Sequence, residues 1–391
     1  MPHDAEFVYD PSRPDFQANA HAIYATLRDE HPVYHDPVRD MWAISRYADV
    51  RDAAADTTNL SSENTEISVG LIPQIQSMDP PRHDALRNLV SRAFTGRRAD
   101  AMEPRIRVIA RELLDALSGR SEVDLMAEFA RHLPSRVIGE MIGVPDDRRE
   151  DFLAWTESMV ETEGDRQTEV VQAATNIYGE FSKLLALRRE KRADDLMSAL
   201  VDIELDGEKL TEEELLGFCF VLIVAGNDTT TNLIANGAVL LAEHPEQRAR
   251  LTRDPRGIPD ALEEMLRYES PAQALPRRVL NDVTLHDTTI PAGAQVRLVW
   301  GAANRDEREF EEPERFDITR APRHLGFGHG THFCLGARLA RLEARVAFEE
   351  LLARMPEYEL TDDPGWLTSI WARSHRRVPV RTGPAPTGRP R

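Results

Sequence analysis

Cysteine is scarce in this chain, which has only two among its 391 residues. Two cysteines can build neither a disulfide framework nor a four-cysteine iron–sulfur site. The sequence also lacks the G-x-G-x-x-G pattern that is typical of a dinucleotide-binding fold. We therefore expect a protein of a reducing cytoplasm that has no iron–sulfur or flavin domain of its own.

A long apolar run and an excess of positive charge are missing too. The most apolar stretch, residues 215–225, is shorter than the roughly 20 residues that span a bilayer. The first six residues have neither the basic nor the apolar segment of a secretory signal. The formal net charge is −19, which argues against general nucleic-acid binding. These features predict a soluble, cytoplasmic protein with no membrane and no nucleic-acid partner.

The interior contains no repeat, no low-complexity tract and no linker rich in serine or glycine. Hydrophobic residues make up 41% of the chain, which is enough for a large core. We predict one domain over residues 1–382 and a disordered tail over residues 383–391. Helical periodicity dominates residues 81–253, a hairpin is expected within 33–45, and short strands within 283–299. The expected fold class is mainly α with a smaller β-rich part.

Cys334 ends a glycine-spaced loop, residues 327–336, and a helix is predicted to follow it. A thiolate at this place faces the positive end of the helix and several free backbone N–H groups. Both effects should lower the thiol pKa. A thiolate held open in this way is a soft, electron-donating metal ligand, as in haem–thiolate proteins.

Two simpler interpretations of this region compete with a haem ligand. His324, His329, His332 and Cys334 could form a zinc site, but the second cysteine pair of a structural zinc site is missing. Cys334 could also be a buried structural cysteine. Cys219, in an apolar run, fits that structural role well, whereas Cys334 lies among glycines and histidines.

The loop resembles the haem-binding signature of the cytochrome P450 family, phenylalanine-glycine-x-glycine-x-histidine-x-cysteine-x-glycine, at every specified position. The resemblance implies the cytochrome P450 fold and haem b as cofactor, with Cys334 as the axial ligand of the iron. It also implies that Phe327, Gly328, His332 and Gly336 belong to the binding loop. The family motifs occur in the family's order from about residue 15 to 380.

Residues 211–243 are predicted to form one long helix, because Thr211 and Glu214 have the spacing of a capping box and Pro245 follows its end. Its middle, residues 225–230, reads Ala-Gly-Asn-Asp-Thr-Thr and breaks several local rules at once. Glycine weakens a helix, threonines bond back to carbonyls, and a buried aspartate needs a partner. Such conflicts are typical of a functional site, and a helix end or a kink without chemistry is the alternative.

The same segment resembles the oxygen-binding groove in the distal helix of the cytochrome P450 family. The resemblance implies that Ala225 lies beside the cofactor and that Gly226 lets the helix open beside dioxygen. The hydroxyl of Thr229 would hydrogen-bond to the oxygen, and Asp228 would deliver protons.

Haem carries two propionates, whose burial requires cations or several hydrogen bonds. His83 and Arg87 lie one helical turn apart on one face and resemble the propionate-binding pair of the family's third helix. Arg277 and His332 resemble two further propionate donors. Arg278 is a close rival of Arg277, since the alignment register alone separates them.

Glu264 and Arg267 share a helix face at positions i and i+3. With Arg315, in the segment Pro-Glu-Arg-Phe, they resemble the glutamate–arginine–arginine cluster of the family. We assign these three residues to the architecture rather than to the chemistry.

The resemblance implies a haem-thiolate monooxygenase that inserts one oxygen atom of O2 into a lipophilic small molecule, most simply by hydroxylation. Electrons would come from a separate ferredoxin and ferredoxin reductase. Arg338, Arg341 and Arg345 fall on one face of the predicted helix and could dock an acidic ferredoxin, although a solvated helix face is the alternative. A peroxide-driven peroxygenase and a haem-binding sensor or carrier are the other function classes considered.

The sequence does not identify the substrate. By family analogy, its pocket would draw on residues 61–76, residues 155–181, Val221 and Val224, residues 272–275 and residues 368–371. Many of these side chains are small or apolar, which favours a lipophilic molecule.

Overall fold

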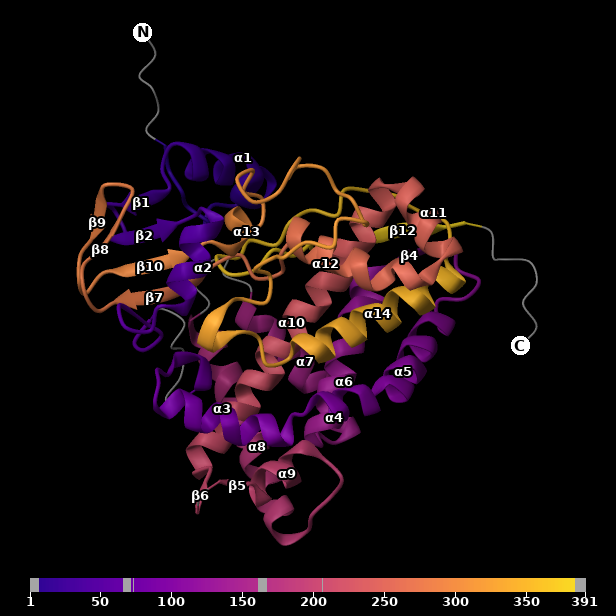
Figure 1. The fold of residues 1–391 in the computed structure, drawn as a ribbon. Coiled ribbons are helices and arrows are strands. Elements are labelled where there is room, and N and C mark those ends of the chain that lie inside the picture. Colours follow the sequence, from indigo (N-terminus) through magenta and orange to yellow (C-terminus); the bar gives the residue numbers. More distant parts are fainter. Residues whose placement is uncertain (1–6, 66–71, 73, 161–166, 206, 384–391) are drawn as a thin grey trace.

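A computed structural model describes residues 7–65, 72, 74–160, 167–205 and 207–383. One sheet lies at one side of the molecule beside helix α1 (Phe16–Asp29), and helices make up most of the remainder (Figure 1). The expectation of a mainly α fold with a smaller β-rich part is confirmed. Of the predicted tail, residues 384–391 lie outside the described residues, whereas Gly383 donates a backbone hydrogen bond to the carbonyl of Glu357 (2.8 Å).

The central element is helix α10 (Glu212–Glu243), and it forms as the sequence predicts. Thr211 caps it, and the Thr211 and Glu214 side chains make both bonds of the capping box. Most of its later turns are buried, because α6 (His132–Ile142), α7 (Arg149–Val160) and α14 (Ala337–Arg354) pack around it. By length and composition α10 could cross a membrane, but 67% of its apolar window is buried inside the protein, as in a core helix.

Helix α14 follows the predicted cysteine loop and crosses α10 closely. A Cβ atom on Gly237 of α10 would lie 2.6 Å from a ring carbon of Phe348 on α14 and 2.7 Å from the sulfur of Met265. Only glycine therefore permits this approach. The crossing thus joins the second half of α14 to the last turns of α10.

The remaining helices surround this crossing, and several of them cover the lower part of the molecule in Figure 1. They are α2 (Tyr47–Ala55), α3 (Arg82–Ala93), α4 (Gly96–Ala101), α5 (Glu103–Asp115), α8 (Gln167–Glu190), α9 (Leu196–Asp202), α11 (Pro245–Arg253), α12 (Ile258–Tyr268) and α13 (Trp300–Ala303).

The largest sheet has five strands in the order β1-β2-β10-β7-β3. Strand β10 runs parallel to β2, and the other pairs are antiparallel. The predicted hairpin within residues 33–45 and the strands within 283–299 are confirmed. These strands are β1 (Val33–Asp36), β2 (Met41–Ile44), β3 (Leu60–Ser61), β7 (Leu275–Val279), β8 (Val283–Leu285), β9 (Thr288–Ile290) and β10 (Gln295–Leu298).

Three smaller sheets lie in the described part of the chain. One joins β4 (Glu122–Asp124), β12 (Pro379–Thr382) and β11 (Tyr358–Leu360), a second is the hairpin of β5 (Glu204–Leu205) and β6 (Glu208–Lys209), and the third pairs β8 with β9. The described residues of 81–253 are thus mostly helical, as predicted, and the short strands β4, β5 and β6 lie between the helices.

Candidate functional site

The cysteine loop is shaped by its glycines. Gly328 and Gly330 have φ values of 72° and 69°, which L side chains rarely adopt. At Gly330 a Cβ would also meet the carbonyl oxygen of Ala54 at 2.8 Å. The backbone N–H of Cys334 donates to the carbonyl of Phe327 (2.9 Å), which closes the loop just before α14 begins. The two glycines of the motif are therefore required by the backbone conformation of the loop.

The pKa of the Cys334 thiol corrects one expectation. Burial raises it, whereas the N–H groups of Gly336 and Ala337 and the charges of Arg87 and Arg341 lower it. The predicted helix-end effect is present, but desolvation of the thiolate outweighs it, and the net shift is upward. A thiolate here therefore needs a cation directly at the sulfur.

Helix α10 has an open face in its middle. Ala225 and Thr229 are exposed, one turn apart, in a helix whose neighbouring positions are largely buried. The Thr229 hydroxyl donates to the carbonyl of Ala225 (2.7 Å), as expected of a threonine that bonds back to the preceding turn. The helix assignment runs through this segment without interruption, so the predicted conflict of local rules produces neither a helix end nor a gap.

Gly226 and Asp228 differ from ordinary packing residues. A Cβ on Gly226 would approach Ile138 only to 3.8 Å, so packing does not demand glycine there. The Oδ2 atom of Asp228 is inaccessible and has no hydrogen-bond partner among the described residues. Burial raises the pKa of Asp228 to about 8, the charge of Glu157 raises it further, and Arg131 lowers it. Asp228 is therefore mostly protonated at neutral pH and can act as a proton donor.

Cationic and imidazole side chains gather near the cysteine loop. The rings of His83 and His332 lie 4.3 Å apart, and Arg87 donates to the carbonyl of Phe333 (2.7 Å). The charges of Arg277, His83 and Arg87 add to burial in lowering the pKa of His332 to about 3. The structure thus brings together the four residues that the sequence predicts as propionate contacts.

The pairing of β7 also distinguishes Arg277 from Arg278. In the pairing of β7 with β10, Arg277 lies opposite Val296 and Arg278 opposite Gln295, so the two side chains leave the sheet on opposite faces. Arg277 is 6% exposed, and its charge acts on His332. Burial lowers its pKa to about 10. Arg277 therefore lies in the cluster around His332, and its contact to a propionate stays a prediction.

Comparison with known proteins agrees with this geometry. The family model described as Cytochrome P450 matches residues 148–256 and 258–362. The chain is 42% identical to Cytochrome P450 107B1 of Saccharopolyspora erythraea, over 94% of this chain and 96% of that protein. This protein is a cytochrome P450.

Two further relatives have informative names. Vitamin D(3) 25-hydroxylase of Pseudonocardia autotrophica is 42% identical, over 94% of this chain and 95% of its own length. The structure of CYP109E1 from Bacillus megaterium in complex with testosterone superposes with a TM-score of 0.86 at 34% identity, covering 94% of this chain and all of that one. The P450 is thus a bacterial-type monooxygenase of a family that uses haem b.

The charges around the cysteine loop fit haem. Among the described residues, no carboxylate forms an ion pair with Arg87 or Arg277, although burial lowers the pKa of both. Arg277 is buried and has only the charge of Asp79 acting to raise its pKa, and Arg87 is half-buried. Cations in such places are costly without anions, and two propionates would add negative charge beside both. Cys334 would be the residue that holds the haem iron, and Ala225 and Thr229 would border its oxygen site.

The zinc interpretation fails in the part of the chain that is described. No group of three or more histidine, cysteine, aspartate or glutamate side chains could hold a metal ion there. His324 instead bonds to Glu263 (3.1 Å), and His332 bonds to the hydroxyl of Ser62 (3.0 Å).

Sequence reasoning placed Ser62 in a substrate-lining segment, residues 61–76, and missed its contact to His332 and the support of that contact. Oδ1 of Asp79 accepts a hydrogen bond from the N–H of Ser62 (2.9 Å), and Oδ2 accepts one from the hydroxyl of Ser61 (2.5 Å). Ser62 in turn positions His332. No periodicity or motif marks Ser62, because its partners come from distant segments.

The structural cluster requires a correction at Arg315. Glu264 and Arg267 pair as predicted, with contacts of 2.7 and 2.8 Å, and both are fully buried. The third guanidinium belongs to Arg320, whereas the Arg315 side chain is 62% exposed and pairs with Glu312 and Asp317. Arg315 contributes only its backbone carbonyl, which accepts from Arg267 (3.3 Å). The prediction of its side chain as the third member was therefore wrong.

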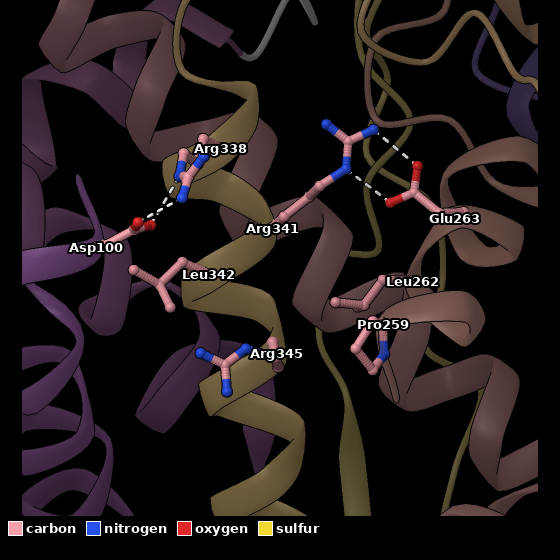
Figure 2. A pocket seen from close by; sticks show the side chains of 8 residues that line it. All are labelled: Asp100, Pro259, Leu262, Glu263, Arg338, Arg341, Leu342 and Arg345. Carbon is pink, nitrogen blue, oxygen red and sulfur yellow. Dashed lines mark hydrogen bonds and ion pairs between the residues drawn. The ribbon is translucent and has the colours of Figure 1, made fainter. Parts of the chain in front are cut away.

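The arginine face of α14 is present but already paired. Figure 2 shows Arg338 paired with Asp100 and Arg341 with Glu263, around a cavity of about 270 Å³ between α4, α12 and α14. Arg345 contacts Glu103 and Glu349, whose side chains are not drawn in Figure 2. The face is therefore a mosaic of both charges, and only Arg338 keeps a largely exposed side chain, at 62%.

The predicted substrate-lining segments are only partly described, since residues 66–71, 73 and 161–166 are outside the described part. Within it, Tyr178 stacks on Phe220 of α10 with ring centroids 4.6 Å apart. Gln74 donates to the hydroxyl of Tyr178 (3.3 Å). Aromatic and amide groups thus meet where α8 and the residue 74–77 turn approach the core helix.

Proposed function

We propose that Cys334 is the axial ligand of haem iron in this P450, and that His83, Arg87, Arg277 and His332 hold the propionates. The observation that carries this proposal is the buried Arg277 and the half-buried Arg87, neither in an ion pair with a carboxylate among the described residues, near the cysteine of a glycine-shaped loop. Haem with a thiolate ligand supplies O–O bond cleavage. Phe327, Gly328 and Gly336 shape the loop, and Ala225 borders the ring.

The distal residues of this chain handle protons. Asp228 holds a proton at neutral pH because its carboxyl is buried, and Thr229 on the open face carries a hydroxyl that can both donate and accept. Gly226 leaves room beside them. We assign Asp228 as the proton donor, Thr229 as the hydrogen-bonding group at the oxygen site, and Gly226 as the residue that keeps this site open.

The spectrum of the reduced protein with carbon monoxide tests this assignment. Haem with Cys334 as ligand gives the long-wavelength Soret band of the family, and C334S should lose this band while still binding some haem. C219S is the matched control, since Cys219 is fully buried in the core and should leave the spectrum unchanged. A colourless protein would contradict the proposal, and so would a C334S protein that keeps the long-wavelength Soret band of the unaltered protein.

The reaction we propose is hydroxylation of a lipophilic small molecule. The support is the aromatic contact at Tyr178 and Phe220 together with the relatives, one named for vitamin D(3) and one solved with testosterone. We therefore propose a substrate with a large apolar skeleton and few polar groups. Testosterone and vitamin D3 serve as first probes: a binder shifts the Soret band by displacing water and then yields a product of one added oxygen. If neither shifts the band, the sterol-like skeleton is the wrong class.

Electron supply is the last part of the proposal. Ferredoxin, reduced by its reductase, would dock over the start of α14, where Arg338 is the most exposed of the three arginines. Because these arginines already have carboxylate partners, docking must exchange internal ion pairs for intermolecular ones. The free Cys219 and Cys334 agree with a reducing cytoplasm as the place of action.

A further inference from the structure

Two elements are joined to α10 by hydrogen bonds on either side of Asp228. Asn227 donates from Nδ2 to Oγ1 of Thr156 on α7 (2.9 Å). Thr231 donates from Oγ1 to the carbonyl of Ala130, at the end of the π-helical turn that precedes α6 (3.3 Å). These contacts fix α7 and the start of α6 against the Asp228 segment.

Each anchoring residue is followed by a charged one. Glu157 follows Thr156, Arg131 follows Ala130, and these two side chains form an ion pair with each other. They are also the two charged groups that act on the Asp228 carboxyl. The Arg131–Glu157 pair, anchored beside α10 by the neighbouring Ala130 and Thr156, is thus the charged group nearest in effect to Asp228.

The Arg131–Glu157 pair lies between solvent and the buried carboxyl of Asp228. The side chains of Arg131 and Glu157 are 33% and 37% exposed, so both can exchange protons and contacts with water. On the inner side, Oδ2 of Asp228 and Nε of Arg131 are inaccessible and have no partner among the described residues. Arg131 thus has donor capacity left for a second carboxylate while it holds the first.

We propose that Glu157 and Arg131 form the proton entrance that reloads Asp228 from solvent. The inference rests on the proposed function, in which Asp228 gives its proton to the oxygen-binding side. It adds a named route for the replacement proton, with Glu157 as the outer carrier and Arg131 as the switch between two carboxylates.

The sequence of events balances in protons and charge. When Asp228 has lost its proton, its carboxylate attracts the guanidinium of Arg131 away from Glu157. Glu157, left without its cation in a half-buried place, takes a proton from solvent, and burial already raises its pKa. That proton passes to Asp228, and Arg131 returns to the Glu157 carboxylate. One proton enters per cycle, and the arginine stays charged throughout.

A purely structural ion pair is the competing explanation, since exposed pairs commonly contribute under about 1 kcal/mol and nothing else. Helix α7 offers a matched control for it. Asp151 lies on the same helix and pairs with Arg148 (2.5 Å), but its charge is not among those that act on Asp228. D151N therefore removes one carboxylate and one ion pair from α7 without touching the proposed entrance.

The experiment compares E157Q, E157D and D151N as haem-loaded proteins with equal carbon monoxide spectra. A saturating plant-type ferredoxin and its reductase drive them with testosterone present, and NADPH oxidation is followed in H2O and in D2O. The rate does not depend on whether testosterone is oxidised, because release of peroxide also consumes two protons. E157Q leaves Arg131 free to hold Asp228 as a carboxylate, so its rate should fall roughly tenfold, as for loss of a proton-transfer group, with a larger solvent isotope effect.

E157D retains a titratable carboxyl and should recover at least half of the rate, and D151N should match the unaltered protein. The inference is overturned if E157Q stays within about twofold of the unaltered protein with an unchanged isotope effect, or if D151N slows turnover as much as E157Q does. An unaltered protein that binds no haem or oxidises no NADPH would overturn the proposed function and, with it, this inference. If only the inference about Glu157 is wrong, the unaltered protein still shows the haem spectrum and still oxidises NADPH, so the proposed function stands.

Discussion

Arg320 donates a hydrogen bond from Nε to Oε1 of the fully buried Glu264, with 3.2 Å between the two atoms. The same guanidinium donates to the carbonyls of Glu311, Glu312 and Arg315. Arg320 therefore ties the segment before the cysteine loop to α12, on which Glu264 lies. A buried carboxylate that loses one of two cations keeps an uncompensated charge, so this contact should matter for stability.

Replacement of Arg320 by glutamine should lower the free energy of unfolding by about 1–3 kcal/mol, the cost of leaving a buried partner unsatisfied. R315Q should cost less than about 0.5 kcal/mol, because exposed pairs contribute little. Urea unfolding of the two haem-loaded variants measures both values. A larger loss in R315Q than in R320Q would show that Arg315, and not Arg320, completes the cluster.

We predict that Arg277 destabilises the haem-free protein and slows the dissociation of haem. R277L removes a buried cation that has no carboxylate partner among the described residues, so the haem-free protein should become more stable. The same change removes a charge-assisted contact to a propionate, worth about 1.5–3 kcal/mol, and haem should dissociate at least about tenfold faster.

Transfer of haem to excess apomyoglobin measures the dissociation rate, and thermal unfolding of the haem-free protein measures the stability. R278L is the control, because Arg278 leaves the sheet on the other face. Equal haem loss in R277L and R278L would contradict the placement of Arg277 in the cluster.

Thr229 separates the three function classes that the sequence leaves open. In T229A the oxygen site loses its hydroxyl, so NADPH oxidation should continue while the fraction that forms product falls about tenfold, within the range of a lost proton-transfer group, and peroxide release rises. T229S keeps a hydroxyl and should recover most of the product. A peroxide-driven enzyme or a haem sensor would show no such split, so unchanged coupling in T229A would exclude the proposed use of O2.

The Asp228 carboxyl makes stability depend on pH in a defined direction. Its pKa is about 8 in the folded protein, against 3.8 for an ordinary aspartate, so the folded state binds an extra proton between these values. Stability from this group is present below pH 3.8 and is lost as pH rises toward 8. D228N has no such loss, so its advantage in free energy of unfolding should grow through this window to about 2–5 kcal/mol. Unfolding curves at pH 5, 7 and 9 check this, and an advantage that shrinks with pH would contradict the burial of Asp228.

Local signals account for what the sequence predicts correctly. The capping box at Thr211 fixes where α10 begins, and the glycine spacing before Cys334 encodes two backbone conformations that only glycine adopts easily. His83 and Arg87 are one helical turn apart, so their shared face follows from helix geometry alone. Each of these features lies within a few residues of sequence.

What the sequence could not predict depends on distant segments or on burial. Ser62 reaches His332 across 270 positions, and Arg320 reaches Glu264 across 56. The pKa of Cys334 rises because the fold buries it, an effect that the local helix end does not reveal. The carboxylates that pair with the arginines of α14 come from α4, α5 and α12 as well as from α14 itself. The spacing of arginines on one helix therefore predicts a more positive surface than the folded protein has.

Those carboxylates lead to a prediction for ferredoxin docking. Asp100 holds the exposed guanidinium of Arg338 in a two-point contact (Figure 2). D100N frees that charge for an acidic partner and should lower the KM for ferredoxin about two- to fivefold at low salt, the scale of a single exposed pair. The gain should vanish near 1 M salt, where the screening length is about 3 Å.

D115N is the matched control, since Asp115 pairs with Arg354 at the far end of α14 (2.8 Å). It removes an equal charge and one ion pair, so a general change in net charge would lower KM equally in both variants. Improvement in D100N alone would place the ferredoxin at the start of α14, beside the cysteine loop. If D100N weakens docking, then Asp100 rather than Arg338 faces the partner, and the electron donor must present a basic surface instead of an acidic one.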